Sequence, residues 1–177
     1  QFSQSHLTFH KDDAAVFGGV RPPLSDIPMS SSMINDLLAG RFSDPDTGKL
    51  VSVGTRSLVI EKTLAGNEGD LVHALSMGRR IAVVSDSNTH QALAERVERS
   101  LTGLSMVDSI ILPGHPHPDD KTVELLREQT KSADAIVAVG SGTINHLCKY
   151  ASALDSKPYA VFATAPSMNG YTSYNAA

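Results

Sequence analysis

The chain has few of the features that would place it outside the ordinary globular domains. A single cysteine, Cys148, excludes an intrachain disulfide, and we interpret it as a small packing residue rather than a nucleophile. No apolar run approaches the roughly 18 residues that a membrane-spanning helix needs. The N-terminus lacks a basic stretch followed by an apolar one, so no secretory signal is predicted. These absences predict a cytoplasmic protein that does not act at a membrane.

An excess of positive charge is also missing. The chain has 15 Lys and Arg residues and 19 Asp and Glu residues, which gives a net charge of −4 at pH 7. This balance argues against a nucleic-acid partner, because such proteins present a basic surface. Apolar residues make up 41% of the chain and charged residues 19%, as in ordinary globular proteins, and 177 residues suffice for one sizeable domain.

From Leu50 onward, short apolar runs alternate with stretches of helical periodicity. The predicted strands are 50–53, 57–60, 81–85, 107–112, 136–139 and 159–162, and the predicted helices are 70–77, 89–101, 119–131 and 144–153. This alternation predicts an α/β fold, with a Rossmann-like parallel sheet and helices on both faces. Gly78 is the predicted left-handed cap of the first helix. Asp119 and Asp120 are the predicted caps of the third.

Residues 1–50 lack this regularity, because prolines and a run of serines interrupt any long element. A short helix is predicted over 33–38, and residues 44–48 have the composition of a turn. We therefore divide the chain into a variable N-terminal leader, 1–50, and a Rossmann-like nucleotide-binding domain, 51–177. The leader is a candidate for subunit contacts in a homo-oligomer.

The predicted strand 136–139 runs directly into Gly140, Ser141, Gly142 and Thr143, after which a helix begins. Glycines let backbone N–H groups approach an anion, and the helix dipole favours negative charge at this end. The sequence therefore predicts a pyrophosphate cradle in these four residues. The alternative is a tight strand-to-helix turn without a ligand, because the third glycine of the dinucleotide fingerprint is missing.

Two strings occur in order, GSGTIN at residues 140–145 and TAPSMNGYTS at residues 164–173. Together they resemble the glycerol-1-phosphate dehydrogenases, of the superfamily of dehydroquinate synthase and the iron-containing polyol dehydrogenases. The resemblance implies NAD or NADP, a divalent metal (zinc, nickel or iron) and a small phosphorylated polyol as substrate. The implied reaction interconverts dihydroxyacetone phosphate and glycerol 1-phosphate.

The resemblance also implies roles for single residues. Asp86, at the end of strand 81–85, is similar to the residue near the adenosine ribose, where a carboxylate favours NAD over NADP. Its alternative role is the N-cap of the next helix. Thr164 and Ser167 resemble the hydroxyl residues that line the same nucleotide cleft. Lys149 also has a counterpart in the family, and its spacing leaves open a solvated cation or a partner of a nearby carboxylate.

Two residues depart from the family pattern where the reaction centre is expected. In the family TAPSM is followed by Asp, a ligand of the catalytic metal, whereas here the position is Asn169, whose neutral amide is a poorer ligand. In the family GSGTIN is followed by an acidic residue near the nicotinamide, whereas here it is followed by His146. We take His146 as a candidate catalytic residue, because the pKa of histidine suits acid–base work. The alternative is a hydrogen-bonded histidine that fills space.

The family has a helical C-terminal domain with two further metal-binding histidines, and we expect that domain to be absent from this chain. The chain would then be the cofactor-binding half of an enzyme and inactive alone. One alternative is a pseudoenzyme or nucleotide-binding scaffold that has lost both carboxylates, and another is a dehydroquinate-synthase-like lyase. His115 and His117 lie between prolines, where we favour an extended loop over a metal site.

Overall fold

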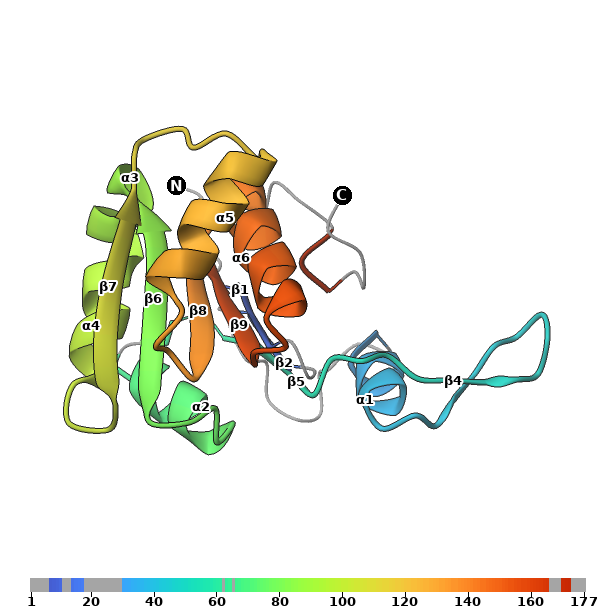
Figure 1. The fold of residues 1–177 in the computed structure, drawn as a ribbon. Coiled ribbons are helices and arrows are strands. Elements are labelled where there is room, and N and C mark those ends of the chain that lie inside the picture. Colours follow the sequence, from blue (N-terminus) through green and yellow to red (C-terminus); the bar gives the residue numbers. More distant parts are fainter. Residues whose placement is uncertain are drawn as a thin grey trace.

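The fold is taken from a computed structural model of the 177-residue chain. It describes residues 7–10, 14–17, 30–61, 63–64, 66–165 and 170–172. Its centre is a parallel sheet of four strands, β6 (Arg80–Asp86), β7 (Met106–Leu112), β8 (Ala135–Gly140) and β9 (Tyr159–Ala163), in the order β7-β6-β8-β9 (Figure 1). Every residue of β8 and β9 is buried. Parallel strands that are covered on both faces have such continuous apolar sequences.

Helices cover both faces of this sheet, as the alternation of the sequence predicts. One face packs against α2 (Glu68–Ala74), the π-helical turn η2 (His90–Ala94) and α4 (Glu95–Leu101), which follow a short α3 (Ser87–Thr89). The other face packs against α5 (Asp120–Gln129) and α6 (Gly142–Leu154), which lie in front of the sheet in Figure 1. Each face has its own cluster of buried apolar side chains. The predicted α/β class is therefore confirmed.

The N-terminal part adds a second sheet of β1 (Leu7–His10), β2 (Ala14–Phe17) and β5 (Ser57–Ile60). Strand β2 pairs antiparallel with β1 and parallel with β5, and both β1 and β2 contact β9. The helix α1 (Ser30–Leu38) and the short strands β3 (Phe42–Ser43) and β4 (Leu50–Val51) extend away from the main body (Figure 1). The division at residue 50 remains a prediction.

Turns and caps follow from local chemistry at two predicted positions. The Asp44 carboxylate accepts hydrogen bonds from the backbone N–H groups of Asp46 and Thr47, at 2.8 and 2.9 Å, which confirms the predicted turn. The Asp119 carboxylate accepts from the N–H of Thr122 at 2.8 Å and caps α5. The single cysteine, Cys148, is fully buried, and burial raises the pKa of its thiol, which confirms a packing role.

The predicted cap at Gly78 is wrong. Helix α2 ends at Ala74, and Ser76, with φ of 53°, takes the left-handed position after it. Gly78 has φ of +108°, and a Cβ there would lie 2.4 Å from the Cβ of Asp134. Glycine at this position therefore serves the close passage of the chain past Asp134, rather than the end of a helix.

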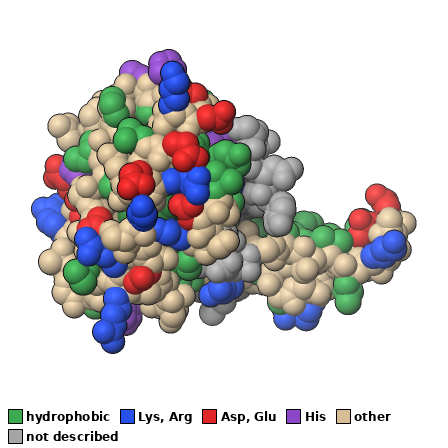
Figure 2. Space-filling model, in the orientation of Figure 1, with side chains coloured by type: hydrophobic (Ala, Val, Ile, Leu, Met, Phe, Trp, Pro, Cys, Tyr) green, Lys and Arg blue, Asp and Glu red, His purple; other side chains and the backbone are tan. Residues whose placement is uncertain are grey.

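The predicted helix 89–101 begins two residues earlier and is not α-helical throughout. Asp86 caps it at Ser87, and residues His90–Ala94 form a π-helical turn before α4. Such turns concentrate at functional sites. None of the described helices is long and apolar enough to cross a membrane. Figure 2 shows acidic and basic side chains interspersed over the face that carries α5 and α6.

Candidate functional site

The site lies where the order of the strands reverses. From β6 the chain moves outward to β7 through α4 on one face, and from β8 it moves outward to β9 through α6 on the other. Strands β6 and β8 are neighbours, with Val84 opposite Ala138. The carboxyl ends of these two strands therefore form the switch point at which open α/β sheets bind ligands. Asp86 ends β6 and Gly140 ends β8, so the fold brings these two predicted residues to one edge.

Asp86 is the N-cap of α3. Its Oδ1 accepts hydrogen bonds from the N–H groups of Asn88 and Thr89, at 2.9 and 2.8 Å, and the Thr89 hydroxyl accepts from the N–H of Asp86 at 3.0 Å. This reciprocal arrangement is a capping box. No described residue donates to Oδ2 of Asp86, which is partly exposed. The capping role is therefore present, and one carboxylate oxygen remains for a ligand.

The glycine turn links the ends of β8 and β9 to α6. A Cβ on Gly140 would lie 2.6 Å from the Cβ of Ile144, so this position needs glycine for the close approach of helix and strand. The Gly140 carbonyl accepts a hydrogen bond from the N–H of Thr164 at 3.1 Å, which fixes Thr164 beside the turn. The fold thus gathers Gly140 and Thr164, from two of the predicted segments, at the same edge.

Helix α6 presents its N-terminus to this edge. Its N-cap is Ser141, in an extended conformation, and among the described residues no side chain caps the helix there. Gly142 and Thr143 are its first two residues and are partly exposed. The backbone N–H groups of a first helical turn have no partner within the helix, and the dipole places partial positive charge on them. This end of α6 is therefore suited to an anion.

His146 lies in the second turn of α6 and is partly exposed. Burial and the nearby charge of Lys149 lower the pKa of its imidazole below the usual 6.5. His146 is therefore neutral at pH 7 and able to accept a proton. The predicted residues Ser167 and Asn169 lie outside the described part of the chain.

The sequence left Lys149 as either a solvated cation or a partner of a nearby carboxylate, and the structure gives it backbone partners. Its ammonium donates hydrogen bonds to the backbone carbonyls of Gly170 and Tyr171, at 3.1 and 3.3 Å. The side chain thus reaches from α6 to the 3-10 turn η3 (Gly170–Thr172) that follows β9. Spacing along α6 cannot reveal this contact, because the partners are backbone groups more than 20 residues away.

In the sequence, Asn145 is notable only because it stands where the dinucleotide fingerprint has its third glycine. It is fully buried, and its Oδ1 accepts a hydrogen bond from the Tyr159 hydroxyl at 2.9 Å. Its Nδ2 has no partner among the described residues. A buried amide of this kind joins α6 to the start of β9. Its position on the apolar face of the helix is the signal that could have revealed it.

His90 also gave no pattern in the sequence. Its Nδ1 lies 3.4 Å from the Ser85 hydroxyl and 3.7 Å from Oε1 of Glu98, and its Nε2 lies 3.9 Å from Oε1 of Glu95. The π-helical turn changes the spacing along this helix, so α-helical periodicity does not predict which side chains meet. The cluster ties the carboxyl end of β6 to α4.

The residues that the structure describes do not form a complete metal site. Within them, no three His, Cys, Asp or Glu side chains are grouped as a metal ion would require. His115 and His117 are both described and belong to no such group. The predicted metal position, Asn169, is not described. The described residues therefore do not fit a metal centre on their own.

Comparisons with known proteins agree on the superfamily. The chain is 28% identical over 134 residues to the NAD(P)+-dependent glycerol-1-phosphate dehydrogenase of Bacillus subtilis, covering 72% of this chain and 34% of that protein. It is 31% identical over 121 residues to the 3-dehydroquinate synthase of Nitrobacter winogradskyi, covering 63% of this chain and 31% of that protein. The chain thus spans about a third of the length of these curated relatives.

Among solved structures, the chain is similar to the glycerol dehydrogenase of Schizosaccharomyces pombe, with a TM-score of 0.44 and 17% identity over 52% of this chain and 24% of that one. A family model described as iron-containing alcohol dehydrogenase matches residues 59–177, which is more than half of the chain. The superfamily resemblance predicted from GSGTIN and TAPSMNGYTS is confirmed, and the chain belongs to the iron-containing alcohol dehydrogenase family.

Proposed function

We propose that this chain is the nucleotide-binding part of an NAD(P)-dependent oxidoreductase that interconverts dihydroxyacetone phosphate and glycerol 1-phosphate. The observation that carries the proposal is the meeting of Asp86 and the α6 N-terminus at the switch point between β6 and β8. A dinucleotide has the matching chemistry, with an anionic pyrophosphate and a ribose that offers hydroxyl donors. The relative from B. subtilis is named as an NAD(P)+-dependent glycerol-1-phosphate dehydrogenase.

In this proposal each group of the dinucleotide has a place on the chain. The pyrophosphate lies at the turn of Gly140, Ser141, Gly142 and Thr143, where the backbone N–H groups and the helix dipole favour an anion. The ribose hydroxyls donate to Oδ2 of Asp86, which no described residue occupies. A 2′-phosphate would be repelled by this carboxylate, so the chain prefers NADH to NADPH. Thr164, which is hydrogen-bonded to the Gly140 carbonyl, lies beside this cradle, and the role that the resemblance implies for Ser167 falls outside the described residues.

A bound nicotinamide supplies or accepts the hydride. The chain contributes His146, which follows the cradle on α6 and is held neutral by burial and by Lys149. A neutral imidazole can accept the proton that a polyol hydroxyl loses during oxidation. No step is assigned to a metal, because the described residues do not form a metal centre.

Two other functions have specific support. The 31% identity to a 3-dehydroquinate synthase favours a lyase that shares the nucleotide site. The presence of His146 and Asn169 at the two positions where the resemblance implies carboxylates favours a nucleotide-binding module without chemistry. Product analysis separates the three functions. Because the chain alone is expected to be inactive, a full-length protein that carries it is incubated with NAD+ and glycerol 1-phosphate, and then with NAD+ and the substrate of dehydroquinate synthase.

The nucleotide site is tested with Asp86→Asn. Asparagine caps helices as well as aspartate does, so the variant keeps α3 and removes only the charge. Hydrogen bonds to a charged group contribute about 1.5–3 kcal/mol, so NADH affinity falls by roughly tenfold or more, whereas NADPH affinity does not fall. The measurement is a fluorescence titration of the chain with each nucleotide.

Asp119→Asn is the matched control. Asp119 is also an extended N-cap that follows a strand of the same sheet, with φ of −122° against −102° for Asp86. This variant should leave both affinities unchanged. Equal NADH affinity in Asp86→Asn and the wild type would remove the ribose role of Asp86. Failure of the wild type to bind either nucleotide would remove the proposed function of this chain.

A further inference from the structure

The segment after β9 turns back onto α6. Lys149, in the third turn of α6, donates to the carbonyls of Gly170 and Tyr171, at 3.1 and 3.3 Å. The Tyr171 side chain is 2% exposed and belongs to the apolar cluster beneath α6, and its hydroxyl donates to the carbonyl of Ala165 at 2.9 Å. Thr164 is bonded in turn to Gly140. Both described ends of this segment, 164–165 and 170–172, are therefore tied to the cradle and its helix.

We propose that Lys149 is a positioning residue, which holds Gly170 and Tyr171 against α6 and so keeps Thr164 and Ala165 beside the nucleotide. The inference rests on the proposed function, because it gives the held segment a role in nucleotide binding. Lys149 does not touch the nucleotide in this scheme. It acts through the carbonyls of Gly170 and Tyr171, and Tyr171 passes the restraint to Ala165.

Half-burial of an ammonium is costly, and this cost supports a positioning role. Burial lowers the pKa of Lys149 to about 8, because the charged form loses hydration at this position. An apolar side chain of similar length would avoid this cost and still pack along its stem. The neutral amine retains two N–H donors, so it can still hold both carbonyls after it loses its proton.

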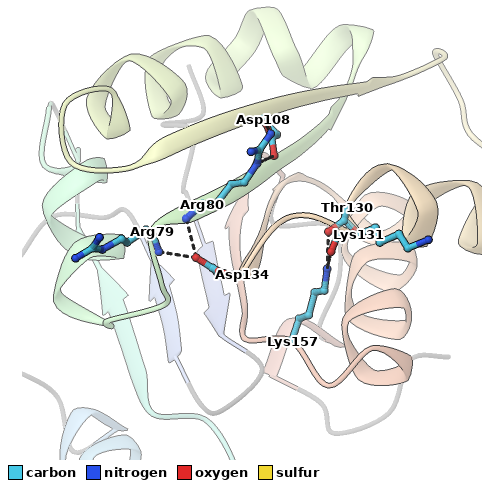
Figure 3. A network of polar contacts seen from close by, with 7 residues as sticks. All are labelled: Arg79, Arg80, Asp108, Thr130, Lys131, Asp134 and Lys157. Atoms are coloured by element: carbon cyan, nitrogen blue, oxygen red, sulfur yellow. Dashed lines mark hydrogen bonds and ion pairs between the residues drawn. The ribbon is translucent and has the colours of Figure 1, made fainter.

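The chain contains a matched control at the opposite edge of the sheet. Lys157 donates to the carbonyls of Thr130 and Lys131, at the amino ends of the strands (Figure 3). It makes the same kind of contact as Lys149, one lysine to two successive carbonyls, far from the cradle in the fold. Lys149→Met and Lys157→Met therefore each remove hydrogen bonds from a lysine to two successive carbonyls, one at each edge.

The experiment uses the full chain with Lys149→Met, Lys149→Arg and Lys157→Met. Two quantities are measured: hydrogen exchange of the backbone amides of Thr164, Gly170, Tyr171 and Thr172, and the Kd for NADH from fluorescence. Lys149→Met should speed exchange of these amides about tenfold and weaken NADH binding several-fold, since a loosened segment is ordered again on binding. Lys149→Arg keeps N–H donors and should restore slow exchange and affinity. Lys157→Met should change neither.

Each of the following results would overturn one part of the proposal. Unchanged exchange in Lys149→Met would remove the restraint itself. Fast exchange with an unchanged Kd would remove its role in nucleotide binding. Equal effects of Lys149→Met and Lys149→Arg would show that the lysine matters for packing rather than for its hydrogen bonds. A wild type that binds no NADH would remove the proposed function, while the exchange rates would still decide whether Lys149 holds the segment.

Discussion

The two edges of the central sheet use their polar residues differently. At the amino edge, polar groups are bound to one another and to the backbone (Figure 3). Oδ2 of Asp134 accepts hydrogen bonds from the N–H groups of Arg79 and Arg80, at 2.7 and 2.9 Å. The Arg80 guanidinium makes two contacts with the Asp108 carboxylate, at 2.6 and 2.9 Å. This edge joins strand to strand.

At the carboxyl edge, fewer of the described polar groups have hydrogen-bond partners. Asp86 uses one carboxylate oxygen for its cap, and no described residue donates to the other. The N-cap of α6, Ser141, makes no side-chain capping bond. Backbone donors and a carboxylate oxygen with spare capacity are costly unless water or a ligand satisfies them. The amino edge therefore joins the strands through its polar groups, whereas the carboxyl edge has polar groups to spare for the nucleotide that we propose it binds.

The largest expected effect is on the amino edge, with Gly78→Ala. The added Cβ would lie 2.4 Å from the Cβ of Asp134, in a backbone with φ of +108°. Strain of this backbone costs about 1–2 kcal/mol, and forced repacking roughly 1–3 kcal/mol more. Urea denaturation should therefore show a large loss of stability, whereas NADH affinity of the folded fraction should be unchanged.

Gly103→Ala separates the two costs of Gly78→Ala. Gly103 has φ of +96°, but nothing lies within 4 Å of a Cβ built there. In this control the free energy of unfolding should fall only by the cost of backbone strain, about 1–2 kcal/mol. Equal losses in the two variants would show that the contact with Asp134 does not matter. A fall in NADH affinity in Gly78→Ala alone would break the separation of the edges.

The core of the fold was predictable because its signals are local. Strands β8 and β9 are apolar runs with clear ends. The predicted 136–139 is therefore one residue short at each end, and the predicted 159–162 is one residue short at its C-terminal end. The end of α2 was not predictable in this way. Gly78 resembles a helix cap in the sequence. A side chain at this position would collide with Asp134, however, and Asp134 is distant along the chain. Strands β1 and β2 were missed, because their pairing with each other and with β5 is set by tertiary contacts.

The candidate site was predictable in its parts but not in its connections. Asp86 and Gly140 could be found because each follows an apolar strand, and the parallel sheet then brings them together. The restraint by Lys149 could not be found, because it depends on the chain after β9 folding back onto α6. The sequence left Asp86 as either a cap or a ribose ligand. One oxygen forms the cap, and the ligand role remains a proposal.

A smaller effect should appear on the amino edge in acid. Backbone hydrogen bonds from Arg80 and Arg79 lower the pKa of Asp134 below that of the unfolded chain, about 3.9. The carboxylate therefore stabilises the fold above this pH, and the contribution is lost as pH falls through the lower, folded pKa. Asp134→Asn keeps an acceptor oxygen but cannot titrate. The midpoint temperature of thermal unfolding should fall more steeply between pH 5 and 3 in the wild type than in this variant. Parallel curves would contradict the stabilising role of the Asp134 carboxylate.

The smallest expected effect is at the carboxyl edge in alkali, where the wild type gains stability as the pH rises. Burial lowers the pKa of Lys149 to about 8, whereas an unfolded lysine titrates near 10.4. Between these values the unfolded chain binds more protons, so the free energy of unfolding rises with pH. Lys149 is partly exposed, so solvent screening keeps the gain small. Urea denaturation at pH 7 to 10 should show the wild type gaining stability relative to Lys149→Met. A constant difference would mean that Lys149 titrates as an exposed lysine, and its cost of burial would then no longer support a positioning role.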